Sequence, residues 1–167
     1  HWTGSRWQAG PSLPDGKLGW VFHDKTGGHP ASSNDRCFVL RWTAPVSGEF
    51  EIQGKLSHRP EPGNGVRGRI VSSEHGILGE WKVDQSEADT PVAKVSVKVG
   101  ETIDFVVDWQ GHITHDEFEW PVLINHLTEN RRKSQWDSKR DFRGVSSDPW
   151  TDYVHALLMT NEFVFLE

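Results

Sequence analysis

Cysteine is almost absent from this sequence. Cys37 is the only one among 167 residues, so the chain can form neither an internal disulfide nor a cluster of thiolate metal ligands. No C-x-x-C-H motif is present, and we expect no haem in this chain. Cys37 lies among apolar neighbours in an alternating segment, which is typical of an inert core thiol rather than a nucleophile.

Positive charge and long apolar runs are also scarce. Lys and Arg number 18 against 24 Asp and Glu, which gives a formal charge of -6. Phosphate backbones repel an acidic surface, so we expect no nucleic-acid partner. No stretch has the apolar length of a membrane span.

Motifs of known catalytic sites are missing as well. The sequence has no G-x-S-x-G elbow, no H-E-x-x-H pair and no phosphate-binding loop, and we expect no enzyme. One enzyme alternative stays open, because a terminal histidine such as His1 can chelate copper through its amine and its ring. Turnover of polysaccharide with and without copper would test it.

Tryptophan, in contrast, is abundant, with nine residues against one tyrosine. Tryptophan fills cores, but it also forms flat platforms in binding sites. Trp42 and Trp120 lie in alternating segments and are predicted to be core residues. Trp7 and Trp20 lie in a stretch rich in Gly, Pro and Ser that is predicted to be mainly loop. With nine tryptophans in one domain, we expect some to be exposed.

Alternation of apolar and polar residues predicts about seven strands. In the segment 48–58, Phe50, Ile52 and Leu56 alternate with charged or polar residues, which is the pattern of a strand with one wet face. Turn-forming residues separate the alternating segments. The predicted strands span 36–44, 48–58, 65–73, 77–84, 92–100, 101–109 and 117–124. Together they predict an all-β fold, an antiparallel β-sandwich.

The C-terminal part of the sequence has a different pattern. Asp148 and Pro149 are typical of the cap and first turn of a helix. An apolar stripe at helical spacing follows, formed by Trp150, Tyr153, Val154, Leu157 and Leu158. The predicted division is a sandwich at 1–125, a polar linker at 126–147 and an amphipathic helix and tail at 148–167.

Two parts of the chain resemble planctomycete proteins. The phrases "VLRWTAPVSGEFEIQGKLSH" and "GNGVRGRI" within 39–70, followed by "VSVKVGETIDFVVDW" and "DEFEW" within 95–120, resemble a carbohydrate-binding-like jelly-roll module. Residues 148–167, "DPWTDYVHALLMTNEFVFLE", resemble the closing helix of planctomycete-specific cytochrome c-associated multi-domain proteins. The chain departs from the family at Asn64 and Glu101, where the family has aspartate, and Asn64 would weaken any cation site there.

The resemblance implies a jelly-roll-like sandwich at the C-terminal end of a larger exported protein. Haem-carrying domains would lie upstream and would be partners of this module. The implied location is periplasmic, cell-surface or secreted.

Aromatic and basic side chains near the strand ends are the candidate ligand contacts. A tryptophan face accepts the C–H face of a sugar, while polar side chains bond its hydroxyl groups. Arg67 and Arg69 project from one face of a strand and could grip carboxylated or sulfated sugars, or could instead form cross-strand pairs with Glu49, Glu51 or Asp104. The predicted ligand-binding residues are Trp81, Trp109, Arg67, Arg69 and His112.

The stretch "DWQGHITHDEFEW" (108–120) is the candidate metal site. Its histidines and carboxylates include possible cation ligands, but they show no recognisable zinc spacing. Calcium accepts aspartate and backbone oxygens more loosely, so the only cofactor we consider is a structural calcium ion at Asp116 and Glu117. The alternative is a hairpin between the last two strands with a solvated tip.

Taken together, these features predict a non-catalytic module that binds complex polysaccharide by tryptophan stacking and polar contacts. The alternative is a structural or docking domain of a larger protein with no glycan ligand. An exposed aromatic patch flanked by polar groups would favour sugar, whereas an apolar patch would favour docking.

Overall fold

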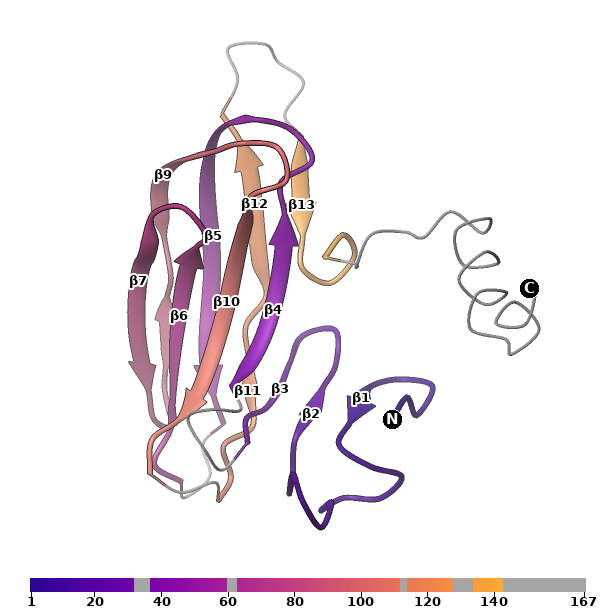
Figure 1. The fold of residues 1–167 in the computed structure, drawn as a ribbon. Coiled ribbons are helices and arrows are strands. Elements are labelled where there is room, and N and C mark those ends of the chain that lie inside the picture. The colour runs from indigo at the N-terminus through magenta and orange to yellow at the C-terminus, as the bar shows by residue number, and fades with distance from the viewer. Residues whose placement is uncertain (32–36, 60–62, 112–113, 128–133, 143–167) are drawn as a thin grey trace, which may run out of the picture.

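The computed structural model describes residues 1–31, 37–59, 63–111, 114–127 and 134–142, and Figure 1 shows how they are arranged. Within these residues every regular element is a strand, and all strand pairs are antiparallel. The strands are β1 (Trp7–Gln8), β2 (Phe22–His23), β3 (Gly27–His29), β4 (Phe38–Thr43), β5 (Gly48–His58), β6 (Val66–Ser72), β7 (Gly76–Val83), β8 (Glu87–Asp89), β9 (Val92–Val97), β10 (Thr102–Trp109), β11 (Phe118–Glu119), β12 (Val122–His126) and β13 (Gln135–Asp137). The predicted all-β class and antiparallel sandwich are confirmed.

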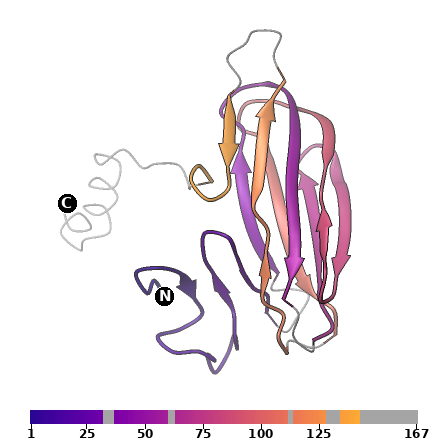
Figure 2. The ribbon, with the colours of Figure 1, turned by 180° about the vertical axis from the view of Figure 1, so that it is seen from behind.

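The strands form two sheets that face each other (Figures 1 and 2). The four-stranded sheet has the order β4-β10-β6-β7. The nine-stranded sheet has the order β1-β2-β3-β11-β5-β12-β13, and β8 and β9 also pair with β5. The long strand β5 is therefore the centre of this sheet, with four partner strands along its two edges.

The core lies between the sheets and follows the alternation of the sequence. Phe50, Ile52 and Leu56 of β5 are fully buried, as are the apolar residues of β10 that face them. Trp42 and Trp120 are also buried, which confirms their prediction as core residues. Burying such side chains stabilises the fold by about 1.5–3 kcal/mol each.

Each of the seven predicted strands has a counterpart in the structure, whereas the short strands β1, β3, β8 and β13 were not predicted. The segment 117–124 is divided into β11 and β12, because Pro121 has no N–H for the ladder between them. The stretch 108–120 is not a hairpin, since β10 belongs to the four-stranded sheet and β11 to the nine-stranded one. It is a connection between the two sheets.

The segment 134–142 lies within the stretch predicted as a linker. Here β13 pairs with β12, and Trp136 packs against the core beside Trp42, with their ring centroids 5.4 Å apart. This part of the predicted linker thus belongs to the sandwich. The predicted helix and tail at 148–167 lie outside the described residues. Among those that are described, no helix is long and apolar enough to cross a membrane.

The N-terminal segment contributes β1, β2 and β3 to one end of the nine-stranded sheet. It joins the rest of that sheet through the pairing of β3 with β11. Gly28 of β3 pairs with Phe118 of β11, and Gly27 pairs with Glu119. A Cβ atom at Gly27 would lie only 2.0 Å from the carbonyl oxygen of Phe118. The two strands can therefore approach each other only because this position is glycine.

Candidate functional site

Two exposed tryptophans lie side by side near the start of the chain. Trp2 and Trp7 are 49% and 57% exposed, and their ring centroids are 5.4 Å apart with the planes tilted by 48°. A tight turn sets this pair, because the Thr3 amide donates to the Arg6 carbonyl at 3.0 Å and Trp2 bridges to Trp7. The rings are cross-strand neighbours and form one aromatic surface.

This aromatic pair borders a cleft that we call the N-terminal cleft. It lies between the N-terminal segment and the sandwich edge formed by β4 and the turn after β13, and its volume is about 460 Å³. Its lining residues are Trp2, Ser5, Trp7, His23, Asp24, Lys25, Leu40, Ser138, Lys139, Arg140 and Phe142. An aromatic platform and polar groups thus meet in one hollow of the size that ligand sites have.

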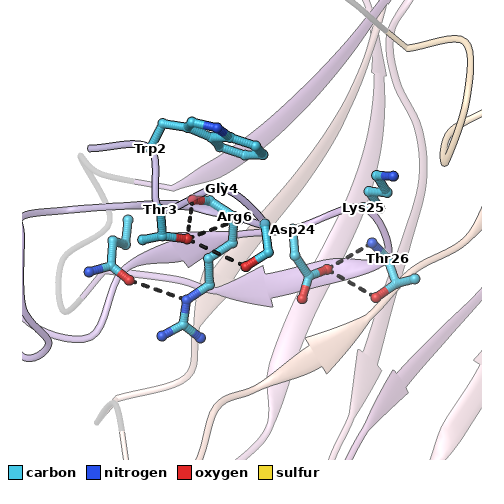
Figure 3. Close-up of a pocket in the computed structure, with 9 residues that line it drawn as sticks. Trp2, Thr3, Gly4, Arg6, Asp24, Lys25 and Thr26 are labelled. Carbon is cyan, nitrogen blue, oxygen red and sulfur yellow. Dashed lines mark hydrogen bonds between the residues drawn. The ribbon is translucent and has the colours of Figure 1, made fainter.

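A second hollow adjoins the N-terminal cleft (Figure 3). It is wider, about 840 Å³, and shares Trp2, Ser5, Asp24 and Lys25 with the first. In Figure 3 the Trp2 ring lies at one side of this hollow, and Asp24 and Lys25 come from the loop after β2. The two hollows together form an extended surface rather than a closed pocket.

Asp24 is fixed in place by its own turn. Its Oδ1 accepts hydrogen bonds from the Thr26 amide at 2.8 Å, the Thr26 hydroxyl at 3.0 Å and the Gly27 amide at 2.9 Å. Burial alone would raise the pKa of this carboxyl, but these donors outweigh it and hold the pKa below the usual value. Asp24 is therefore an ionised and preorganised acceptor at the centre of the site.

His23 is the other titratable group beside Asp24. Burial lowers the pKa of its imidazole, and the nearby Asp24 carboxylate offsets only part of this effect. Its ring packs edge-on against Phe38 with centroids 4.9 Å apart. At neutral pH His23 is thus an uncharged wall of the N-terminal cleft.

Two lysines give the cleft positive charge. Lys25 and Lys139 are both exposed. Neither has an ion-pair partner among the residues that the structure describes. Arg140, by contrast, contacts Asp141 through two hydrogen bonds of 2.8 Å. The lysine ammonium groups are the basic groups of the cleft that remain available to a ligand.

Arg67 and Arg69, predicted as ligand contacts, lie on the outer face of the four-stranded sheet, where both hold Asp108 of β10. Arg67 donates from Nε and Nη2 to its two carboxylate oxygens at 2.9 and 3.0 Å, and Arg69 donates at 2.6 Å. This is the cross-strand alternative, but with a different carboxylate. Of the three expected partners, Asp104 pairs with Arg41 and Glu49 pairs with Lys94.

The two predicted sugar-stacking tryptophans are half-buried and lie apart from the N-terminal cleft. Trp81 of β7 packs against the core, and its ring lies over Gly79 two residues earlier. Trp109 ends β10, where it pairs with Val66. The structure does not bring either of them together with the Trp2 and Trp7 pair.

The inter-sheet connection contains the other predicted residues. His112 lies outside the described residues. Asp116 is fully buried, with its Oδ1 3.9 Å from Nε2 of His58, whereas Glu117 forms an exposed ion pair with Arg59 at 2.7 Å. No group of three metal-ligating side chains occurs within the described parts of the chain. Calcium at Asp116 and Glu117 stays a prediction.

The buried His58 has a defined role in this connection. Its Nδ1 accepts from the Gln85 amide at 3.0 Å, so its Nε2 carries the proton and donates to the His115 carbonyl at 2.8 Å. His58 thereby ties β5 to two loops. These contacts are those of a structural histidine.

Sequence reasoning placed Trp7 in a loop and did not single out the site. A signal was nevertheless present in "WTGSRW" (2–7), where two tryptophans flank a four-residue turn with glycine at its second position. Such flanking residues are cross-strand neighbours. The sequence holds no comparable sign that Leu40 and the turn after β13 complete the cleft.

Comparison with known proteins does not assign this chain to a family. No protein-family model matches the chain, and no curated protein matches it at a significant level. The assignment of function therefore depends on the site itself.

Proposed function

We propose that this protein is a non-catalytic module that binds complex polysaccharide in the N-terminal cleft. The observation that carries the proposal is the exposed pair of Trp2 and Trp7 beside a cleft lined by polar side chains. A sugar ring stacks its C–H face on an aromatic face and directs its hydroxyl groups to polar neighbours.

The polar groups needed for such a ligand are close to the rings. Asp24 offers an ionised carboxylate whose position is fixed by three donors, and Ser5 and Lys25 line the same two hollows. The extended shape suits several units of a chain rather than one small molecule. The aromatic patch flanked by polar groups is the arrangement expected for sugar rather than for docking.

The wider setting remains part of the proposal. A jelly-roll arrangement, a place among exported multi-domain proteins and a periplasmic, cell-surface or secreted location follow from the resemblance to planctomycete proteins. A structural calcium ion at Asp116 and Glu117 would lie at the inter-sheet connection and not in the cleft.

A glycan array tests the proposal directly. The purified chain is applied to the array in calcium and again in EDTA. Binding to a defined glycan class, lost in Trp7→Ala and kept in Trp20→Ala, supports the proposal. Trp20 is a matched control, because it is 48% exposed but does not line either hollow. Loss of binding in EDTA would make a cation part of the interaction.

A docking function is the second candidate, and one observation favours it. The outer face of the four-stranded sheet carries exposed Val39 and Ile77 with the half-buried Val106 and Val71 paired beside them. An apolar patch of this kind is typical of protein contacts. If a folded sample bound no glycan and Val39→Asp abolished association with upstream domains, docking would replace glycan binding.

A further inference from the structure

We infer that the polysaccharide bound in the N-terminal cleft is anionic, with carboxylate or sulfate groups. This inference rests on the proposed function and specifies its ligand. It begins from a local reversal of charge. The chain carries a formal charge of -6. Among the described residues, however, the two hollows are lined by four basic side chains, Arg6, Lys25, Lys139 and Arg140, and by one carboxylate, Asp24.

The contacts of these groups show which charges are available. Arg140 is balanced by Asp141, and Arg6 lies over the Phe22 ring at 4.6 Å and donates to Gln8. Lys25 and Lys139 have no acidic partner among the described residues. Asp24 stays ionised with its Oδ1 held by three donors of its own turn, so one carboxylate stands against the two lysines. His23 adds no charge at neutral pH, because burial favours its neutral form.

The two lysines come from opposite walls of the cleft. Lys25 follows β2 in the N-terminal segment, and Lys139 follows β13 at the edge of the sandwich. A chain lying across the rings of Trp2 and Trp7 would therefore meet an ammonium group on each side. Flexible lysines act as point charges and accept carboxylate and sulfate without the planar geometry that arginine requires.

The two arginines predicted as ligand contacts already have a carboxylate partner. Arg67 and Arg69 share the buried carboxylate of Asp108. An anionic ligand there would have to compete with Asp108 for the same guanidinium groups. In the N-terminal cleft, the ligand itself would supply the missing negative charge.

Matched ligands test the inference. An α-1,4-galacturonate hexamer and its fully methyl-esterified form share one backbone and differ in charge, and a carrageenan hexamer and its desulfated form make a second pair. We expect at least one charged form to bind about tenfold more tightly than its neutral partner, because only the charged form can make ion pairs with the two exposed lysines. Salt at 0.5 M should remove most of this advantage.

Variants of the full chain make the test specific. Lys25→Ala combined with Lys139→Ala should reduce the preference for the charged over the neutral form about tenfold, and the corresponding double arginine variant should keep that preference. Lys82→Ala on the outer sheet face is the control and should change nothing. Trp7→Ala should weaken both forms.

The outcomes separate the two proposals. Equal binding of charged and neutral forms, or full affinity in the double alanine variant, overturns the anionic ligand and leaves glycan binding intact. Binding of neutral glycans alone on the array would likewise overturn the anionic ligand and leave glycan binding intact. If a folded sample binds no glycan of either kind, glycan binding itself is overturned.

Discussion

Arg67 holds the carboxylate of Asp108 through two parallel hydrogen bonds of 2.9 and 3.0 Å, on a sheet face otherwise open to solvent. Asp108 is only 2% exposed. Four residues earlier on the same strand and face, Asp104 forms an equally regular pair with Arg41, but Arg41 is 59% exposed. The two pairs have the same chemistry and different surroundings.

This contrast predicts unequal costs of mutation. Asp108→Ala should lower the free energy of unfolding by about 1.5–3 kcal/mol, because charge-assisted bonds to two arginines are lost in a water-poor site. Asp104→Ala should cost about 0.2–1 kcal/mol, as exposed pairs do. Urea denaturation of both variants measures the difference. Equal losses of unfolding free energy in the two variants would mean that the burial of Asp108 does not strengthen its pairing with arginine.

A second stability prediction concerns the buried indole of Trp120. Its Nε1 donates to the Thr90 hydroxyl at 2.9 Å, and both residues are inaccessible to solvent. Thr90→Val keeps the shape but leaves the indole N–H without an acceptor, and we expect a loss of about 1–3 kcal/mol by thermal or urea unfolding. Thr90→Ser keeps the acceptor and should recover most of this loss; a serine variant as unstable as the valine variant would contradict the role of the bond.

Gly27 should control whether the N-terminal cleft exists at all. Gly27→Ala places a Cβ atom against the Phe118 carbonyl, so β3 should separate from β11 while the sandwich core stays folded. We expect faster hydrogen exchange in residues 1–31 and a loss of glycan binding, with exchange in β5, β6 and β10 unchanged. Gly16→Ala is the control, because a Cβ atom there meets nothing. Normal glycan binding by Gly27→Ala would place the ligand elsewhere.

The stacking role of Trp7 predicts a defined loss of affinity. Trp7→Ala should weaken glycan binding by about 1–3 kcal/mol, as expected for an aromatic anchor of a binding site. Isothermal titration calorimetry measures the change, and the melting temperature should stay the same because the ring is exposed. Trp81→Ala and Trp109→Ala test the original candidates. If either of these abolished binding and Trp7→Ala did not, the site would lie at the strand ends instead.

His23 predicts a pH dependence of stability. Its pKa in the folded protein lies below the ordinary 6.5 because the ring is buried, so the unfolded chain takes up a proton first as the pH falls. Above pH 6.5 the group has no effect, and below it stability should decline until the folded-state pKa is reached. Asp24 and the neighbouring Lys25, Lys139 and Arg140 face this ring. Melting curves between pH 8 and 5 should fall less steeply for His23→Gln than for the natural sequence, and parallel curves would contradict this account.

The sequence predicted the sandwich well because period-two alternation reports directly which face of a strand is buried. Phe50 and Ile52 are buried as their alternation predicted, and β5 spans the predicted residues 48–58. Within the predicted strand 92–100, the same alternation would place Val99 on the inner face with Val95 and Val97, and there it fails. Val99 is 64% exposed because β9 ends at Val97 and a turn follows.

The candidate site was less predictable for physical reasons. Strand β3 consists of Gly27, Gly28 and His29, and glycine carries no hydropathy signal, so its pairing with β11 could not be predicted from alternation. The partner of Arg67 depended on a register between strands that are distant in sequence. Local patterns specify elements, whereas the cleft arises from how distant elements meet.

The position of β5 at the centre of the nine-stranded sheet also constrains how the chain folds. Its partners β8, β9, β11 and β12 all follow it in sequence, and β3, which precedes it, pairs with β11 rather than with β5. During synthesis β5 therefore leaves the ribosome before any of its partner strands. One of its edges can pair once β9 has emerged at Val97, whereas the other stays open until β12 is complete at His126. Folding dominated by such long-range pairing is slow, and open strand edges favour aggregation. Charged side chains on an unpaired strand oppose such association, and the wet face of β5 carries Glu49, Glu51 and Lys55.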